Sequence, residues 1–182
     1  MQIALKGKSK RDIEQARVTD LLKAANYRAS IIAGTGFGKT RVMWKAIIRA
    51  WKQNPTTILI LVPFDHLKDR FKDELLSFMV GPEDGKITAR DAFWDQWVTA
   101  KCYASIDKLD PRMYGITVGD EAHLGMTDNC LSYYEKVTGP IMFCTATMPE
   151  DPIYRNRMLH IAPLAYEISL DECVKRGGRI RW

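Results

Sequence analysis

The sequence predicts an α/β fold in which a mostly parallel sheet is flanked by helices. Short apolar segments alternate along the chain with segments of helical periodicity. The apolar segments lack a polar–apolar alternation, which is typical of strands buried on both faces. A glycine-rich stretch at residues 34–38 lies between one such segment and a helix. α/β folds bind ligands at positions of this kind, where the carboxyl end of a strand meets a helix.

Apolar, largely β-branched runs mark the expected strands. They lie at residues 29–33, 56–62, 98–103, 116–118, 141–144 and 159–165. Pro63 ends the second run, since proline has no amide to donate to a neighbouring strand.

Helical spacing of apolar residues predicts the segments between these strands. Helices are expected at residues 12–26, 40–51, 65–79 and 86–97, a helical turn at 105–109, and a polar helical segment before Gly139. Asn54-Pro55 would end the second helix, and Asp65 can cap the third. We expect the tryptophans of the second and fourth helices to pack in the core rather than to stack on bases.

Length and composition indicate one compact domain inside the cell. The chain has 182 residues, of which 46% are hydrophobic and 27% are charged, as in ordinary globular proteins. The sequence shows no signal peptide and no apolar run near the roughly 20 residues of a membrane helix. Its four cysteines lack the spacing of a zinc site or a disulfide scaffold. We therefore expect a cytoplasmic protein with no membrane partner.

The net charge of +5 belongs to the two ends of the sequence. Residues 1–11 and 175–182 together hold eight basic side chains and no acidic ones. The remainder holds 19 basic against 22 acidic residues, so its net charge is slightly negative. The overall charge is therefore poor evidence for a basic nucleic-acid groove on the body of the domain.

A phosphate-binding loop is predicted at Ala33-Gly34-Thr35-Gly36-Phe37-Gly38-Lys39-Thr40. The glycines allow backbone amides to converge on phosphate oxygens, and the N-terminus of the following helix adds partial positive charge. Lys39 can reach the β- and γ-phosphates of a nucleotide, and Thr40 can bind magnesium. We therefore expect residues 34–40 to bind ATP and Mg²⁺.

Two carboxylates follow the strand at residues 116–118, in the sequence Asp120-Glu121-Ala122-His123. Hydrolysis of a nucleoside triphosphate needs a carboxylate near magnesium and a group that orients the attacking water. Asp120 suits the first role, through a coordinated water, and Glu121 suits the second. We expect Lys39, Asp120 and Glu121 to be the catalytic residues, gathered at the carboxyl edge of the sheet.

A third motif, Thr145-Ala146-Thr147, directly follows the strand at residues 141–144. Its hydroxyl groups could bond to the Asp120–His123 turn and sense its state. Together and in this order, the three motifs resemble those of the first RecA-like domain of superfamily 2 helicases and translocases of the DEAD/DEAH type. The resemblance covers most of the chain. It implies a single RecA-like P-loop NTPase domain in which His123, Thr145 and Thr147 couple nucleotide state to nucleic acid.

The resemblance also implies roles outside these motifs. Gln15 resembles the upstream glutamine that reads adenine in many members. Leu61-Val62-Pro63 looks like the segment whose following helix holds a nucleic-acid phosphate, although Asp65 places a negative charge there. Ser105 lies where members often have a second contact with the strand. Pro63 and Ser105 are thus the expected nucleic-acid contacts.

Residues 165–177 resemble the segment that leads into the second domain of restriction-enzyme motor subunits and related DNA helicases. This favours DNA over RNA as the partner. We expect a basic N-terminal segment at residues 1–11, a RecA-like ATP-binding domain at 12–165, and a C-terminal segment at 166–182 that leads toward a second RecA-like domain. That second domain, which supplies an arginine in the family, would lie in a missing C-terminal part or act in trans.

The expected function is therefore that of an ATP-hydrolysing N-terminal motor domain of a nucleic-acid helicase or translocase, incomplete without its second domain. Two alternatives remain open. One is a stand-alone P-loop ATPase, for example of the phage packaging type, which an arginine of this chain close to the γ-phosphate would favour. The other is a regulatory nucleotide-binding module without helicase activity.

Overall fold

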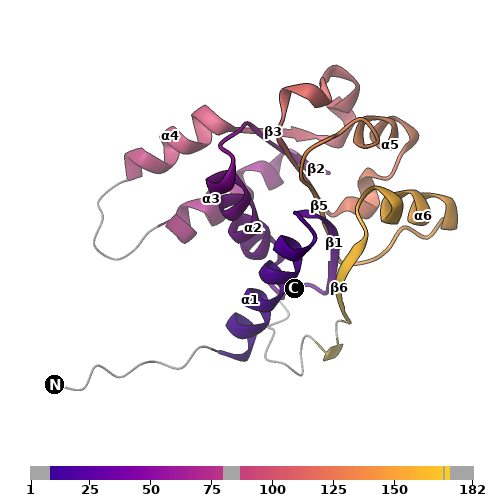
Figure 1. Cartoon of the computed structure of the whole chain (residues 1–182), viewed down its shortest axis with the longest axis horizontal. Coiled ribbons are helices and arrows are strands. Elements are labelled where there is room, and N and C mark those ends of the chain that lie inside the picture. Colours follow the sequence, from indigo (N-terminus) through magenta and orange to yellow (C-terminus); the bar gives the residue numbers. More distant parts are fainter. Residues whose placement is uncertain (1–8, 80–86, 170, 173–182) are drawn as a thin grey trace.

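The sheet has six strands, all parallel, in the order β3-β2-β4-β5-β1-β6 (Figure 1). The computed structural model describes residues 9–79, 87–169 and 171–172. The strands are β1 (Arg28–Ala33), β2 (Ile58–Val62), β3 (Val98–Cys102), β4 (Ile116–Asp120), β5 (Ile141–Thr145) and β6 (Leu164–Ile168). This arrangement confirms the predicted RecA-like α/β fold.

Helices cover both faces of the sheet (Figure 1). On one face lie α1 (Lys10–Ala24), α2 (Lys39–Gln53), α3 (His66–Met79) and α4 (Ile87–Trp97). On the other lie α5 (Asp128–Tyr134), α6 (Pro152–Ile161) and the 3₁₀ helices η1 (Tyr103–Lys108) and η3 (Ala122–Gly125). A further short helix, η2, spans Pro111–Met113.

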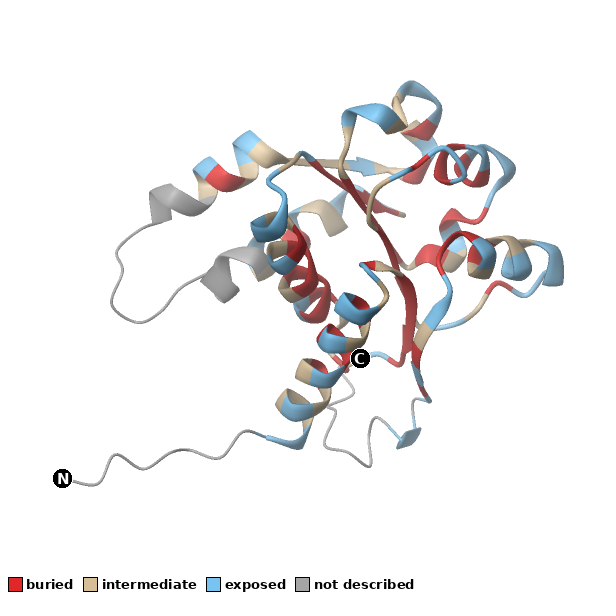
Figure 2. Cartoon of the chain, in the orientation of Figure 1, coloured by how far each residue is buried: buried red, intermediate tan, exposed pale blue. Residues whose placement is uncertain are grey.

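The core consists of two apolar clusters, one on each face of the sheet. All five residues of β2 are buried, and Figure 2 shows the central strands buried along their lengths. Ile58 and Ile60 belong to the cluster beneath α1 and α2, whereas Leu59 and Leu61 belong to the cluster beneath α5 and α6. This alternation explains the uninterrupted apolar runs, since side chains on both faces of each strand must be apolar.

The tryptophans of α2 and α4 pack where the core was expected. Trp44 is fully buried, and its indole Nε1 donates a hydrogen bond of 2.8 Å to the Phe71 carbonyl of α3. The ring of Trp51 meets those of Phe93 and Trp97 edge to face, at centroid distances of 5.2 and 5.3 Å. These contacts join α2 to α3 and α4.

The prediction of a strand at residues 159–165 is wrong in its position. Helix α6 continues to Ile161, and β6 begins only at Leu164. The helix starts at Pro152, which is favoured at a first helical position, and the Asp151 side chain accepts a hydrogen bond of 2.7 Å from the amide of Ile153. The pair Asp151-Pro152 therefore indicates the start of a helix. The prediction missed this helix because its last residues are apolar and were assigned to a strand.

The expected domain limits, residues 12 and 165, lie within α1 and β6. Helix α1 begins at Lys10 after the cap residue Ser9, and β6 extends past residue 165 to Ile168. Most of the expected N-terminal segment, residues 1–8, and residues 173–182 of the expected C-terminal segment lie outside the described residues. None of the described helices has the length and apolar character needed to cross a membrane.

Candidate nucleotide-binding site

The predicted phosphate-binding loop joins β1 to α2. Gly36 and Gly38 have φ angles of 88° and 85°, a region that residues with a Cβ rarely adopt. Gly38 precedes the first residue of α2, so the loop ends at a helix N-terminus, where amides are unpaired and anions are favoured. A Cβ on Gly38 would lie only 2.5 Å from Nε2 of Gln15. The loop therefore has the backbone of a phosphate cradle.

Lys39 and Thr40 occupy the first turn of α2, directly after this loop. The Lys39 ammonium donates to the Ala33 carbonyl at 3.1 Å and lies 3.4 Å from Oε1 of Glu121. Thr40 is buried, with 5% of its surface exposed. The fold thus brings the lysine of the first motif to the carboxylate of the second, across the sheet from β1 to β4.

Glu121 lies just past the end of β4 in a left-handed conformation, with φ 44° and ψ 50°. A non-glycine residue in this region costs roughly 1–2 kcal/mol. Its carboxylate is held by the Ala146 amide, which donates to Oε2 at 3.2 Å, and by Lys39. The carboxylate of Glu121 therefore lies between Lys39 and the amide that follows β5, at the carboxyl edge of the sheet.

Asp120 is the last residue of β4, and 5% of its surface is exposed. Burial raises the pKa of its carboxyl, and the neighbouring charge of Glu121 raises it further. A hydrogen bond from the Cys144 thiol and the charges of Lys39 and Arg70 act in the opposite direction. The result is a carboxyl whose pKa lies above its ordinary value in the folded protein.

The second and third motifs are directly bonded. His123 Nδ1 lies 2.7 Å from the Thr145 hydroxyl, and that hydroxyl lies 2.8 Å from the Thr147 carbonyl. The Thr145 hydroxyl can donate its one proton to the Thr147 carbonyl and accept from the tautomer of His123 that carries hydrogen on Nδ1. Thr147 takes part through its backbone, while its side chain is exposed.

Gln15 lies on α1, against the phosphate-binding loop. Its Nε2 donates a buried hydrogen bond of 2.7 Å to the Phe37 carbonyl. Its Oε1 is buried, and among the described residues it has no hydrogen-bond partner. An unsatisfied buried acceptor is costly, so this atom suits a ligand that donates a hydrogen bond.

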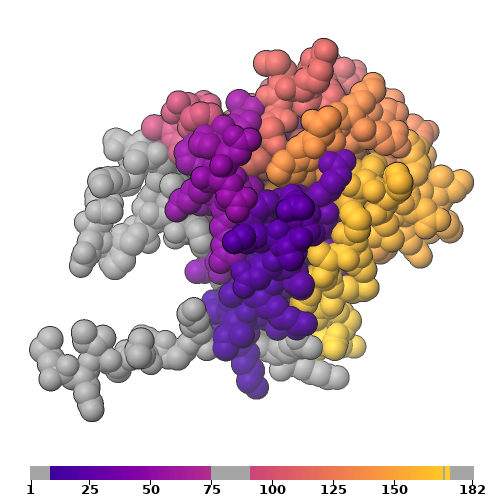
Figure 3. Space-filling model, viewed as in Figure 1, coloured from indigo at the N-terminus to yellow at the C-terminus, as the bar shows by residue number. Residues whose placement is uncertain are grey.

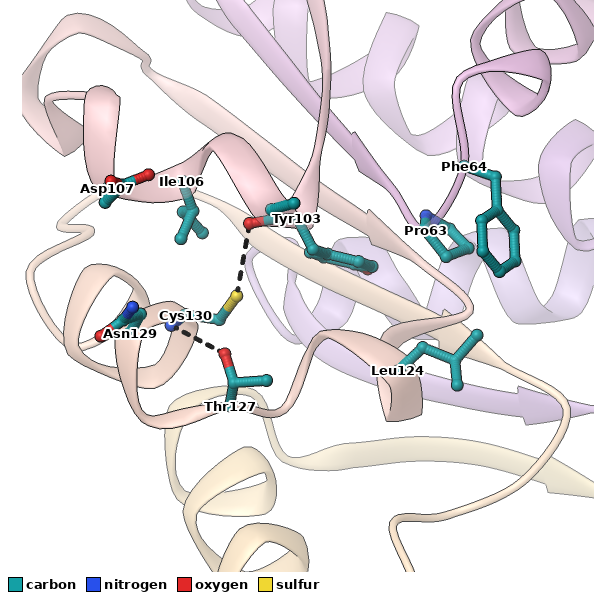
Figure 4. A pocket seen from close by; sticks show the side chains of 10 residues that line it. Pro63, Phe64, Tyr103, Ile106, Asp107, Leu124, Thr127, Asn129 and Cys130 are labelled. Atoms are coloured by element: carbon teal, nitrogen blue, oxygen red, sulfur yellow. Dashed lines mark hydrogen bonds between the residues drawn. The ribbon is translucent and has the colours of Figure 1, made fainter.

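The two expected nucleic-acid contacts lie near one pocket of about 450 Å³ (Figure 4). Pro63 lines it, as do Ala104 and Ile106, the neighbours of Ser105 on η1. Ser105 is half-buried and is not part of the lining. The side chain of Asp65 accepts from Lys68 and from the Cys102 thiol. Its negative charge is thereby paired within the first turn of α3.

Two contacts at this edge were not predicted from the sequence. Cys144 is paired in register with Asp120, and its thiol donates to the Asp120 Oδ1 at 3.1 Å. The Tyr103 hydroxyl donates a buried hydrogen bond of 2.7 Å to the Asp120 carbonyl. The position of Cys144 directly before the third motif was the available signal for the first contact. Neighbouring parallel strands bring such strand-end residues together.

Comparisons with known proteins agree with this fold. Residues 8–150 match the family described as "Type III restriction enzyme, res subunit". A comparison with curated proteins gave no match.

Solved structures of helicases share the fold at low sequence identity. The Hef helicase domain of Pyrococcus furiosus is 14% identical, with a TM-score of 0.63 over 91% of this chain and 38% of its own. The UvsW helicase of bacteriophage T4 is 16% identical, with a TM-score of 0.59 over 84% of this chain and 58% of its own.

A restriction enzyme is also similar. A nuclease-deletion mutant of the Type ISP restriction-modification enzyme LlaGI, in complex with a DNA substrate mimic, is 18% identical. Its TM-score is 0.62 over 90% of this chain and 20% of its own. The chain therefore spans less than two thirds of each of these structures.

The family match covers most of the chain. The parallel sheet places the three motifs found in the sequence at one edge. The chain belongs to the family of type III restriction enzyme res subunits and has the fold of the N-terminal RecA-like domain of superfamily 2 helicases.

Proposed function

We propose that this chain binds ATP with Mg²⁺ and hydrolyses it as the N-terminal motor domain of a DNA-directed helicase or translocase. The observation that carries the proposal is the approach of Lys39 to Glu121 at 3.4 Å. At this distance, the lysine that follows the phosphate-binding loop lies beside a carboxylate that can orient water. Phosphoryl transfer depends mainly on such positioning and on charge stabilisation.

The residues at this edge fit the nucleotide and its metal ion. The amides of residues 34–38 and the N-terminus of α2 would hold the phosphates, and Lys39 would turn from the Ala33 carbonyl toward them. Gln15 Oε1, an unsatisfied buried acceptor, would take a hydrogen bond from adenine.

The Thr40 hydroxyl and the Asp120 carboxylate are oxygen donors of the kind that Mg²⁺ prefers. Mg²⁺ would neutralise charge on the β- and γ-phosphates. No described cluster of three or more histidine, cysteine, aspartate or glutamate residues could hold a metal. This suits an ion that binds together with its nucleotide.

Completion of the site would require a second RecA-like domain. An arginine supplied by such a domain is worth about 10³–10⁵ in rate. We expect the 182-residue chain alone to hydrolyse ATP slowly. The domain would follow Trp182 in a longer protein or act in trans. DNA is favoured over RNA by the restriction-enzyme family of the chain and by the DNA mimic bound to its structural neighbour LlaGI.

A stand-alone P-loop ATPase is the second candidate, and one observation favours it. The charge of Arg70, on α3, acts on the Asp120 carboxyl and lowers its pKa, although more weakly than the other groups around it. The stand-alone candidate requires an arginine of this chain to reach the γ-phosphate, and the charge of Arg70 acts on this carboxyl. A substitution of Arg70 distinguishes the two candidates.

The test of the proposed function compares the unsubstituted chain with Lys39→Ala and Glu121→Gln. Binding of a fluorescent ATP analogue and release of phosphate are measured with and without single- and double-stranded DNA and RNA. We expect Lys39→Ala to abolish binding. Glu121→Gln should retain binding and lower hydrolysis by about 10²–10⁴-fold, the usual contribution of a group that handles the proton of the nucleophile.

Each contrary result has a definite meaning. Normal ATP binding by Lys39→Ala, or normal hydrolysis by Glu121→Gln, would remove the proposed ATPase site. Stimulation by RNA alone would retain the motor and change its substrate. Survival of the cellular function with both substitutions would favour the regulatory module.

A further inference from the structure

Phe37 is the one residue with a side chain between the left-handed Gly36 and Gly38 of the phosphate-binding loop. Its ring is buried, with 3% of the residue exposed. Its amide donates to the Gly34 carbonyl at 3.3 Å. Glycine has more backbone freedom than any other residue type, and Phe37 has a glycine on each side. Contacts from outside the loop are therefore needed to keep it ordered.

The backbone of Phe37 is held by α1. Gln15 donates from Nε2 to the Phe37 carbonyl at 2.7 Å, and the bond is buried. This fixes the orientation of the peptide between Phe37 and Gly38, whose amide lies at the start of α2. This hydrogen bond uses only the carbonyl of Phe37, so the aromatic ring can make a separate contact.

The ring of Phe37 is held by Tyr166 of β6. The two rings are stacked, with centroids 5.7 Å apart and an interplanar angle of 25°. Tyr166 is paired in register with Ile31 of β1, the strand that leads into the loop. Its hydroxyl donates a hydrogen bond of 2.8 Å to Oε1 of Glu14 on α1.

These contacts connect four residues, which we call the Phe37 clamp: Glu14, Gln15, Phe37 and Tyr166. Glu14 and Gln15 are consecutive on α1, so one helix reaches Phe37 both directly and through Tyr166. Helix α1 and β6 lie side by side although they come from opposite ends of the chain (Figure 3). From the sequence alone, a role in nucleotide binding is expected for Gln15 and Phe37 but not for Glu14 or Tyr166.

We propose that Tyr166 is a positioning residue for the phosphate-binding loop, acting through the ring of Phe37. The proposal rests on the proposed binding of ATP by that loop. A loop already held in its binding conformation loses less conformational entropy when phosphate binds, so its affinity is higher. By linkage, nucleotide on the loop should in turn slow the opening of β6.

The experiment uses the unsubstituted chain with three variants. Tyr166→Leu removes the stacked ring and the hydroxyl, while Tyr166→Phe keeps the ring and loses only the bond to Glu14. Met158→Ala is the matched control for stability, because Met158 is fully buried on α6, in the core cluster on the opposite face of the sheet. Thermal unfolding, hydrogen exchange of the amides of residues 36–39, and the affinity for a fluorescent ATP analogue are measured for each.

We expect Tyr166→Leu to speed exchange of the loop amides and to weaken nucleotide binding by about two- to tenfold, the range of aromatic pair energies. Tyr166→Phe should retain most of both properties. Met158→Ala should lower the melting temperature without changing either. In the unsubstituted chain, the nucleotide should slow amide exchange in β6.

Unchanged loop exchange in Tyr166→Leu would overturn the proposal. So would an equal change of the loop in Met158→Ala, since the effect would then follow stability alone. Failure of the unsubstituted chain to bind ATP would remove the proposed function. The loop exchange of Tyr166→Leu would still decide whether Tyr166 positions the loop.

Discussion

His123 and Thr145 connect the carboxyl ends of two adjacent strands through a contact of 2.7 Å between Nδ1 and Oγ1. His123 follows β4 and Thr145 ends β5, so a movement of either strand end must bend or break this bond. Since the same turn holds Glu121, the bond is well placed to relate the position of the water-orienting carboxylate to events elsewhere in the protein.

Thr145→Val should therefore uncouple hydrolysis from nucleic acid. Valine is nearly isosteric with threonine but has no hydroxyl to accept from His123 or to donate to Thr147. We expect slow basal hydrolysis to persist and stimulation by DNA to fall by about tenfold, the equivalent of 1.4 kcal/mol. Phosphate release with and without DNA measures both quantities.

Thr147→Val is the matched comparison, because Thr147 enters this network through its backbone. It should keep more of the stimulation than Thr145→Val. Equal losses in the two variants would contradict a role for the hydroxyl of Thr145.

Asp120→Asn should stabilise the fold at neutral pH while removing activity. Because burial raises the pKa of Asp120, the folded protein holds this proton more tightly than the unfolded chain does. The corresponding stability is present below the ordinary pKa of 3.8 and is lost as pH rises through the raised native pKa. The amide of asparagine does not titrate in this pH range, so Asp120→Asn lacks this loss of stability.

Thermal unfolding of both proteins from pH 4 to 7, without added nucleotide or magnesium, measures this difference. We expect the melting temperature of Asp120→Asn to exceed that of the unsubstituted chain at pH 7, because the raised pKa of Asp120 makes its ionised form unfavourable in the folded protein. The advantage should shrink as pH falls toward 4. A constant difference across this range would exclude Asp120 as its source.

Gln15→Ala should reduce the preference for adenine. In the proposed complex, its buried Oε1 accepts from the amine at position 6 of adenine, where guanine has a carbonyl that cannot donate. We expect ATP to lose more affinity than GTP in competition with a fluorescent nucleotide. Lys23→Ala, on the exposed side of α1, is the comparison and should change neither. Equal losses for ATP and GTP would assign Gln15 to loop structure alone.

Arg70→Ala distinguishes a motor that needs a second domain from a self-contained ATPase. A transition-state arginine contributes about 10³–10⁵ in rate, so its removal from a self-contained enzyme would be conspicuous. We expect the turnover of this chain to stay within about tenfold, because the proposed motor takes its transition-state arginine from a second domain. A loss of a thousandfold or more would favour the stand-alone enzyme.

Local sequence signals predicted the elements that position the site. The strand before Gly34 and the helix after Lys39 follow from apolar patterning, and the left-handed glycines follow from the absence of a Cβ. The meeting of Lys39 and Glu121 follows from parallel pairing, because β1 and β4 end at the same edge with β5 between them.

Contacts set by strand order could not be predicted in the same way. The pairing of β6 with β1 brings Tyr166 to Phe37, and no local pattern specifies which strand lies next to which. Cys144 likewise reaches Asp120 only because β4 and β5 pair in that register. Helix α6 was missed for a different reason, since its apolar end at Leu159–Ile161 outweighed the cap at Asp151.

The place of β1 in the sheet has a consequence for synthesis of the protein. Its residues 28–33 leave the ribosome early, yet both of their partners, β5 and β6, lie beyond residue 140. Closing such distant pairs is slow, because chain entropy must be lost before the contacts form. The phosphate-binding loop, which follows β1, therefore acquires its final shape only after β5 and β6 have been made. A nascent chain shorter than about residue 168 should emerge without a working nucleotide site.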